Sequence, residues 1–189
     1  MAGIVGILLA AGRGRRFDPQ GQRNKLLQPL PGGDVVAAAS ARHLLAALPR
    51  VIAVVRADDD ATAALLAAAG CEVTRCLDAD SGMAASLVHG LRRAESAAGW
   101  VVALADMPHV RPATIAALRQ AVLEGAPIAV PVHQDKRGNP VAFGRRHLPE
   151  LLALSGDRGA RGIVSNNPVN EVCVDDPGIL LDIDTPTDL

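Results

Sequence analysis

Residues 4–17 read IVGILLAAGRGRRF, an unbroken apolar run that leads directly into a loop of glycine and arginine. An apolar run of this length in an α/β-type chain predicts a strand that is buried on both faces. The glycines at 12 and 14 let the backbone turn tightly and bring its N–H groups close to an anion. The three arginines add fixed positive charge, and Lys25 follows shortly after. The stretch therefore predicts a phosphate-binding loop.

Two common phosphate-binding patterns do not fit this loop. The dinucleotide fingerprint G-x-G-x-x-G requires glycine where Phe17 stands. The Walker A pattern requires Ser or Thr after its lysine, and Lys25 is followed by Leu26. Taken alone, the loop is also compatible with a plain strand–helix turn whose arginines are solvated, because short motifs often match by chance.

The rest of the chain alternates between strand-like and helix-like segments. We predict strands at 4–9, 51–55, 72–77, 100–105, 128–130, 141–143 and 171–174, and helices at 35–48, 58–69, 83–98, 112–124, 148–154 and 157–165. Asp34 is the expected N-cap of the first helix. Short connections between alternating elements are typical of right-handed βαβ units. We expect an α/β fold: a single three-layer Rossmann-like domain over residues 1–189, its mostly parallel sheet covered by helices on both faces.

Composition narrows the class of protein. The 189 residues are 49% hydrophobic but only 2% aromatic, and the net charge is -1, which argues against a nucleic-acid-binding surface. No apolar run approaches the ~18 residues of a membrane span, and the N-terminus lacks the basic region of a signal peptide. The three cysteines, Cys71, Cys76 and Cys173, have no metal-type spacing and suit free thiols in a reducing compartment, with a Cys71–Cys76 pair as the alternative. A cytoplasmic protein is expected.

Carboxylates stand where a ligand of such a sheet would bind. Asp106 ends the apolar strand at 100–105, and a carboxylate there is costly unless it meets a cation or strong donors. Mg²⁺ on phosphate oxygens suits this position because it takes one or two carboxylates. Asp182 and Asp184 point the same way if their segment is extended. Capping of a turn or a helix is the alternative role for these aspartates.

Three further segments have the composition of binding loops. In GMAASL, residues 82–87, Gly82 would permit close approach to a flat ligand, and Ser86 can bond a base edge. The alternative is an ordinary helix start. RGNPV at 137–141 and GDRGAR at 156–161 are glycine-containing loops whose charges are either ligand-binding or simply solvated.

Seven segments in this order resemble the MobA-like nucleotidyltransferases, and in particular the group that attaches a nucleotide to molybdopterin. They are L-A-A-G-x-G-x-R at 9–16, K-L-L at 25–27, G-M-x-x-S-L at 82–87, D-M-P at 106–108, R-G-N-P-V at 137–141, G-D-x-G-A-R at 156–161 and D-I-D-T-P at 182–186. The resemblance covers nearly the whole chain and implies a nucleotide-diphospho-sugar transferase-like fold. The loop at 17–24 is longer than in the family, which puts the reach of Lys25 in question. The usual Gly-Pro start of the next helix is replaced by PGGDV at 31–35.

The resemblance assigns roles to residues of this chain. It implies catalytic roles for Arg16, Lys25 and Asp106, with Mg²⁺ held by Asp106 and Asp184 and supported by Asp182. It implies nucleotide binding by two groups of residues, namely Leu9, Ala10, Ala11, Gly12 and Gly14, and Gly82, Met83 and Ser86. It places Asn139, Arg158 and Arg161 on the side of the acceptor. It also suggests a molybdoenzyme or a chaperone as a protein partner.

The prediction of which nucleotide is used depends on one position. Guanylyltransferases of the group tend to have L-A-G-G and cytidylyltransferases L-A-A-G, and Ala11 stands at the third letter here. The expected reaction is transfer of CMP from CTP to the phosphate of molybdopterin, with release of pyrophosphate. Transfer from GTP, another phosphorylated acceptor and a nucleotide-binding regulator without turnover are the alternatives. The joint presence of Arg16, Lys25, Asp106 and Asp184 argues against the regulator.

Overall fold

A computed structural model describes residues 3–157 and 159–189. Its strands are β1 (Ile4–Ala10), β2 (Val51–Arg56), β3 (Glu72–Cys76), β4 (Gly99–Leu104), β5 (Ile128–His133), β6 (Lys136–Arg137), β7 (Val141–Gly144) and β8 (Asn170–Cys173). Its α-helices are α1 (Val36–Ala47), α2 (Asp60–Ala68), α3 (Met83–Arg92), α4 (Pro112–Leu123), α5 (Leu148–Leu152) and α6 (Arg161–Asn166). Short 3-10 turns include η1 (Lys25–Leu27) and η2 (Ala79–Ser81).

The strands form one mixed sheet in the order β3-β2-β1-β4-β7-β5-β6, with β8 beside β5. β1 pairs in parallel with both β2 and β4, and Leu9 is opposite Leu104 in the register. β7 runs antiparallel between β4 and β5. The predicted mostly parallel α/β sheet is confirmed, and the β5–β6 hairpin is an addition to it. Because β1, β2 and β4 are parallel, their carboxyl ends meet at one edge.

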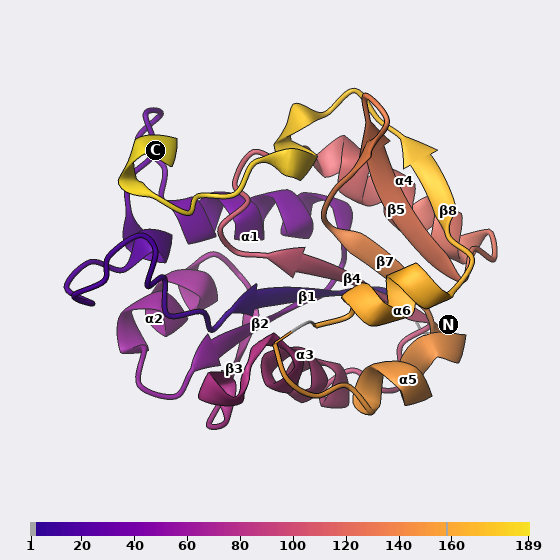
Figure 1. Cartoon of the computed structure of the whole chain (residues 1–189), viewed down its shortest axis with the longest axis horizontal. Helices are drawn as coiled ribbons and strands as arrows, with labels where there is room; N and C mark the ends of the chain where they lie inside the picture. Colours follow the sequence, from indigo (N-terminus) through magenta and orange to yellow (C-terminus); the bar gives the residue numbers. More distant parts are fainter. Residues whose placement is uncertain (1–2, 158) are drawn as a thin grey trace.

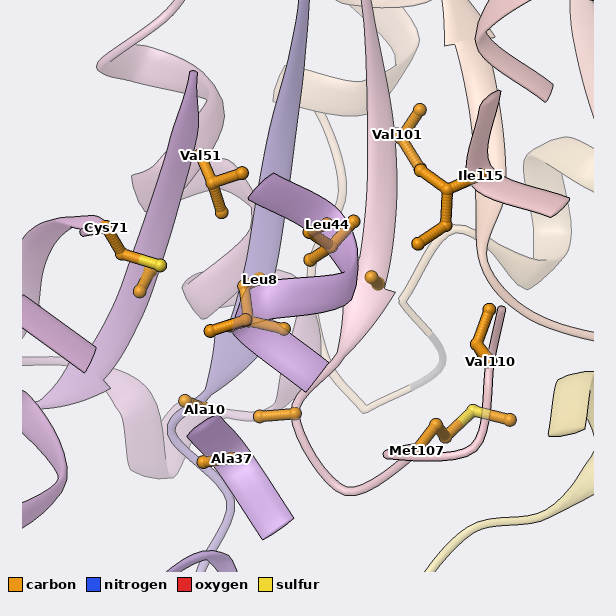
Figure 2. Packing of buried hydrophobic residues seen from close by; sticks show 14 of the residues in the cluster. Leu8, Ala10, Ala37, Leu44, Val51, Cys71, Val101, Met107, Val110 and Ile115 are labelled. Carbon is orange, nitrogen blue, oxygen red and sulfur yellow. The ribbon is translucent and has the colours of Figure 1, made fainter. Parts of the chain in front are cut away.

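Helices cover both faces of the sheet (Figure 1). One apolar cluster joins the sheet to α1, α2 and α4, and contains Leu8, Leu44 and Ile115 (Figure 2). A second cluster joins the other face to α3, α5 and α6, around the fully buried Trp100 and Phe143. Alternate residues of β1 enter opposite clusters, which explains why its sequence is apolar throughout.

Several predicted helix ends differ from the structure, and three of these differences have a clear local reason. Val35, and not Asp34, is the N-cap of α1; the Asp34 carboxylate accepts the N–H of Val35 instead. α3 ends at Arg92, six residues early, in a series of turns where the Ala94 carbonyl accepts the indole N–H of Trp100. α6 begins only at Arg161, because Gly159 has a left-handed backbone (φ 52°) that breaks a helix there.

The cysteines form no disulfide: Cys71 and Cys76 are buried and Cys173 is exposed. Burial raises the pKa of the Cys71 thiol to about 11, so this thiol is unreactive near neutral pH. Among the residues that the structure describes, no helix is long and apolar enough for a membrane crossing.

Candidate active site

A cleft of about 610 Å³ opens beyond the carboxyl ends of β1 and β4. Its lining gathers segments that are far apart in sequence: Leu9 to Arg16, Lys25, Leu26, Ala79, Asp80, Gly82, Met83, Ser86, Leu104, Asp106, Asp157, Arg161, Asp182 and Asp184. This is the edge at which open α/β sheets bind ligands. Every predicted nucleotide-binding, catalytic and metal-binding residue lies on this lining.

Gly14 fixes the shape of the loop that follows β1. Its backbone is left-handed (φ 60°), and its carbonyl accepts the N–H groups of both Phe17 and Asp18. A Cβ at this position would lie 3.4 Å from Cγ of Lys25. Glycine is therefore suited both to the turn and to the close passage of the lysine stem.

The long loop at 17–24 folds on itself and leaves Lys25 within reach of the cleft. The Asp18 carboxylate accepts the backbone N–H groups of Gln20 and Arg23. The Asn24 side chain accepts the N–H of Leu26 and donates to Asp59 at the start of α2. These bonds anchor η1, on which Lys25 stands, against α2.

Four charged side chains form what we call the inner cluster: Lys25, Asp106, Asp184 and Arg16. Lys25 Nζ lies 2.6 Å from Asp106 Oδ2 and 3.4 Å from Asp184 Oδ1. Arg16 contacts the other oxygen of Asp184 at 2.6 Å. The Lys25, Asp106 and Asp184 side chains are only 12–20% exposed, whereas Arg16 is 77% exposed. The cluster therefore combines three largely buried charges with one solvated arginine.

The C-terminal segment reaches the inner cluster through the main chain. The carbonyl of Asp106 accepts the N–H of Ile183 at 2.8 Å, and the Ile183 side chain is buried. The Asp188 carboxylate accepts the N–H groups of Asp184 and Thr185 and closes the final turn. Figure 1 shows the yellow C-terminal segment running back beside the indigo loop after β1.

The inner cluster suits a divalent cation that is also bound by phosphate. Asp106 Oδ1 is buried and has no hydrogen-bond partner in the described part of the chain, a state that a bound cation would satisfy. Partial burial and the neighbouring Asp184 raise the pKa of Asp182, as expected where carboxylates crowd together. The described residues contain no group of three or more metal-type side chains that could hold an ion by themselves. Mg²⁺ needs only one or two carboxylates when phosphate oxygens supply further ligands.

The structure shows a reason for glycine at position 82 that was not predicted. Its backbone has φ 113°, and a Cβ there would lie 2.6 Å from the Gly156 carbonyl oxygen. That carbonyl accepts the N–H of Ala84 in the first turn of α3. Close approach of the Gly156 backbone and the Asp157 carboxylate therefore requires glycine at 82, and Gly82 also lines the cleft. Ser86 is buried on α3 and still lines the cleft.

The predicted acceptor residues separate. Arg161 lines the same cleft as Lys25 and Asp106. Asn139 is not on this lining: its N–H bonds the Ile179 carbonyl, and it borders a separate small cavity beside His43. Arg158 lies outside the described residues. Of the two that the structure describes, Arg161 lies at the cleft and Asn139 does not.

Sequence reasoning gave no individual role to Arg13 and Arg15, beyond the positive charge of their loop, and no role at all to Asp80 and Asp157, which also lie on the lining. With them, the described lining holds five cationic and five anionic side chains. The charges of the described lining are therefore balanced, although those of the loop after β1 are positive. Asp157 lies in the 156–161 motif, of which only the arginines were assigned a role, and Asp80 lies just before the motif at 82–87.

A glycine–arginine loop after the first parallel strand, facing carboxylates at the end of β4 and near the C-terminus, defines a nucleotide-binding α/β protein equipped for phosphate chemistry. A family model, the MobA-like NTP transferase domain, matches residues 6–172. The chain belongs to this nucleotidyltransferase family.

Individual relatives span almost the whole chain. The purine catabolism protein PucB of Bacillus subtilis (strain 168) is 31% identical, over 97% of this chain and 92% of that protein. The crystal structure of Rv0371c from Mycobacterium tuberculosis H37Rv is 31% identical, with a TM-score of 0.82 over 98% of this chain and 95% of that one. A manganese complex of Rv0371c is similar, with 30% identity and a TM-score of 0.79 over the same shares.

A more distant structure shares the fold. Molybdopterin-guanine dinucleotide biosynthesis protein A from Archaeoglobus fulgidus has a TM-score of 0.71 and 22% identity, over 98% of this chain and 94% of that one. The predicted nucleotide-diphospho-sugar transferase-like fold is confirmed by these neighbours.

Proposed function

We propose that this protein transfers CMP from CTP to the phosphate of molybdopterin and releases pyrophosphate. The observation that carries the proposal is the inner cluster, with Lys25 2.6 Å from Asp106, placed beside the Gly/Arg loop in one cleft. Family membership supports nucleotidyl transfer. The Archaeoglobus protein is named for molybdopterin-guanine dinucleotide biosynthesis, which supports a pterin acceptor.

The reaction requires no nucleophile from the protein. An oxygen of the acceptor phosphate attacks the α-phosphorus of the nucleotide, and pyrophosphate leaves. Catalysis is then positioning and stabilisation of developing charge. Lys25 and Arg16 stabilise the charge on the transferring and departing phosphates, the 11–14 backbone holds the nucleotide, and Arg161 contacts the acceptor.

Asp106 and Asp184 are the residues that would hold Mg²⁺. The bound ion would supply neutralisation of the phosphate charges. The manganese complex of Rv0371c supports a divalent cation in this family. In the structure described here, Lys25 and Arg16 neutralise the same two carboxylates, so these cations are held close to where phosphates would bind.

The choice of CTP rests on the base side of the cleft. Ala11 is buried and lines the cleft, and its methyl group narrows the space beside the base, which favours a pyrimidine. The backbone near Leu9 and Ala10 and the hydroxyl of Ser86 are the candidates for bonds to the cytosine edge.

A screen of nucleotides tests this function. The purified protein is incubated with Mg²⁺, with each of CTP, GTP, ATP and UTP, and with or without molybdopterin, and pyrophosphate release is measured. We expect release with CTP and only when molybdopterin is present. A preference for GTP would show that GTP, and not CTP, is the nucleotide substrate. Tight binding of Mg·CTP without release of pyrophosphate with any acceptor would indicate a nucleotide-binding regulator.

The proposal also includes a single domain over 1–189, a cytoplasmic location, and transfer of the product to a molybdoenzyme or chaperone.

A further inference from the structure

A second group of charges, the outer cluster, crosses the rim of the same cleft. It consists of Arg13, Asp80, Arg56 and Asp58. Arg13 binds both oxygens of Asp80, with Nε 2.6 Å from Oδ1. Arg56 donates to Asp80 Oδ1 at 3.0 Å and to Asp58 at 2.7 Å. Asp80 therefore joins two arginines from different parts of the fold.

The outer cluster connects the sheet to the phosphate loop. Arg56 is the last residue of β2, and its side chain is only 13% exposed. Asp80 lies in η2, just before α3, and Arg13 lies in the loop after β1. Arg13 and Asp80 both line the cleft. A continuous path of charged hydrogen bonds thus runs from a rigid strand, through the segment that opens α3, to the Gly/Arg loop.

We propose that Arg13 and Asp80 are positioning residues that hold the phosphate loop against the start of α3 before the nucleotide binds. This inference rests on the proposed function, because a nucleoside triphosphate is the ligand of that loop. Both Arg13 nitrogens that face Asp80 are occupied by its carboxylate. In this arrangement Arg13 orders the loop, and Arg16 and Lys25 are left to act on the phosphates.

The Arg13–Asp80 pair orders the phosphate loop and contributes little to the stability of the whole fold. Its side chains are 44% and 60% exposed, and ion pairs with this exposure typically contribute little to folding. Variants at either position should therefore fold. Without the pair, the free loop would be more mobile, and the nucleotide would have to order it on binding, which weakens affinity.

The direction in which one substitution changes nucleotide affinity distinguishes this positioning role from electrostatic attraction of the triphosphate. Asp80→Asn removes a negative charge from the cleft, so charge alone predicts tighter binding of a triphosphate. We expect weaker binding instead, by about two- to fivefold, as for the loss of one solvent-exposed ion pair. Arg13→Gln should weaken binding to a similar degree, and the double variant should be little worse than either single one, because both remove the same interaction.

Glu72→Gln is the matched control. Glu72 binds both Nε and a terminal nitrogen of Arg50, with exposures of 58% and 39%, and neither residue lines the cleft. It removes the same type of ion pair at a distance from the nucleotide. Affinity is measured by calorimetry with Mg·CTP and Mg·GTP, without an acceptor.

Hydrogen exchange gives a measurement that does not depend on nucleotide binding. In the unliganded protein, the amides of residues 11–16 should exchange faster in Asp80→Asn and Arg13→Gln than in wild type or Glu72→Gln. Unchanged exchange of this loop overturns the inference, and so does equal or tighter nucleotide binding by Asp80→Asn. If wild type binds neither nucleotide, the proposed function fails, and the exchange rates still decide whether the pair orders the loop.

Discussion

The inner and outer clusters have the same balance of charges in different surroundings. Each has two cations and two carboxylates, and both border one cleft. The central pair of the inner cluster, Lys25 and Asp106, is 12% and 19% exposed, and that of the outer cluster, Arg13 and Asp80, is 44% and 60% exposed. Charges interact more strongly where water is excluded. This difference in burial is the reason that we assign the chemistry to the inner cluster and the ordering of the loop to the outer cluster in the proposals above.

The largest expected effect is that of Asp106→Ala. The variant should lose nearly all turnover, because it removes the carboxylate whose buried Oδ1 is available to a metal ion. It should still fold, since Asp106 follows β4 at the edge of the cleft rather than within a hydrophobic cluster. Pyrophosphate release and thermal melting check both statements. Turnover like that of wild type in a folded variant would exclude the assigned role.

The two cations of the inner cluster should differ in effect. Lys25→Ala and Arg16→Ala should each lower kcat/KM by on the order of 10²-fold or more, the scale for one preorganised stabilising donor. The loss should be greater for Lys25, because it is 12% exposed and Arg16 is 77% exposed. Steady-state kinetics with CTP decides the matter. If both variants stay within about threefold of wild type, the loop is not the phosphate site.

A smaller change is expected at the base side. Wild type should prefer CTP to GTP, and Ala11→Gly should relax this preference only in part, because one methylene provides about 1–3 kcal/mol of discrimination. Ser86→Ala should reduce the preference through a lost hydrogen bond. The measurement is kcat/KM for CTP and GTP in the three proteins. Complete reversal by Ala11→Gly alone would contradict this description of the pocket.

The smallest effect concerns stability and pH. The pKa of Asp182 is raised by burial and by Asp184, so the folded state favours its protonated form. The stabilisation from this protonation is complete below the ordinary pKa and is lost as pH rises through the raised pKa. Asp182→Asn should therefore raise the Tm at pH 7, and the difference from wild type should shrink at low pH. Asp175→Asn, at a carboxylate that is 97% exposed, is the control. If the Tm of Asp182→Asn at pH 7 is not higher than that of wild type, the inferred crowding of carboxylates is contradicted.

Much of the fold follows from local patterns in the sequence. The apolar runs at 4–9, 51–55 and 100–105 predicted β1, β2 and β4 to within about two residues, since buried parallel strands are continuously apolar. Helix ends were harder to predict. The early end of α3 and the late start of α6 depend on a contact with Trp100 and on the backbone of Gly159. Such tertiary contacts and backbone angles produce no periodic pattern in the sequence.

The site was predictable in its position but not in its pairings. Gly12, Gly14 and Asp106 follow strand ends, and strand ends of parallel sheets meet at one edge. Lys25 and Asp184 are 159 residues apart, and Arg13 and Asp80 are 67 apart, so their contacts depend on the assembled fold. The reason for Gly82 was likewise hidden, because its neighbour is the backbone at 156.

Binding of Mn²⁺ in the presence of saturating CTP tests the central claim most directly, because the free and bound ion are distinguished by electron paramagnetic resonance. We predict that wild type and Asp80→Asn bind Mn²⁺ under these conditions, and that Asp106→Ala and Asp184→Ala lose most of this binding while they remain folded. Mn²⁺ affinity equal to that of wild type in both Asp106→Ala and Asp184→Ala would contradict the assignment of the inner cluster as the metal–nucleotide site.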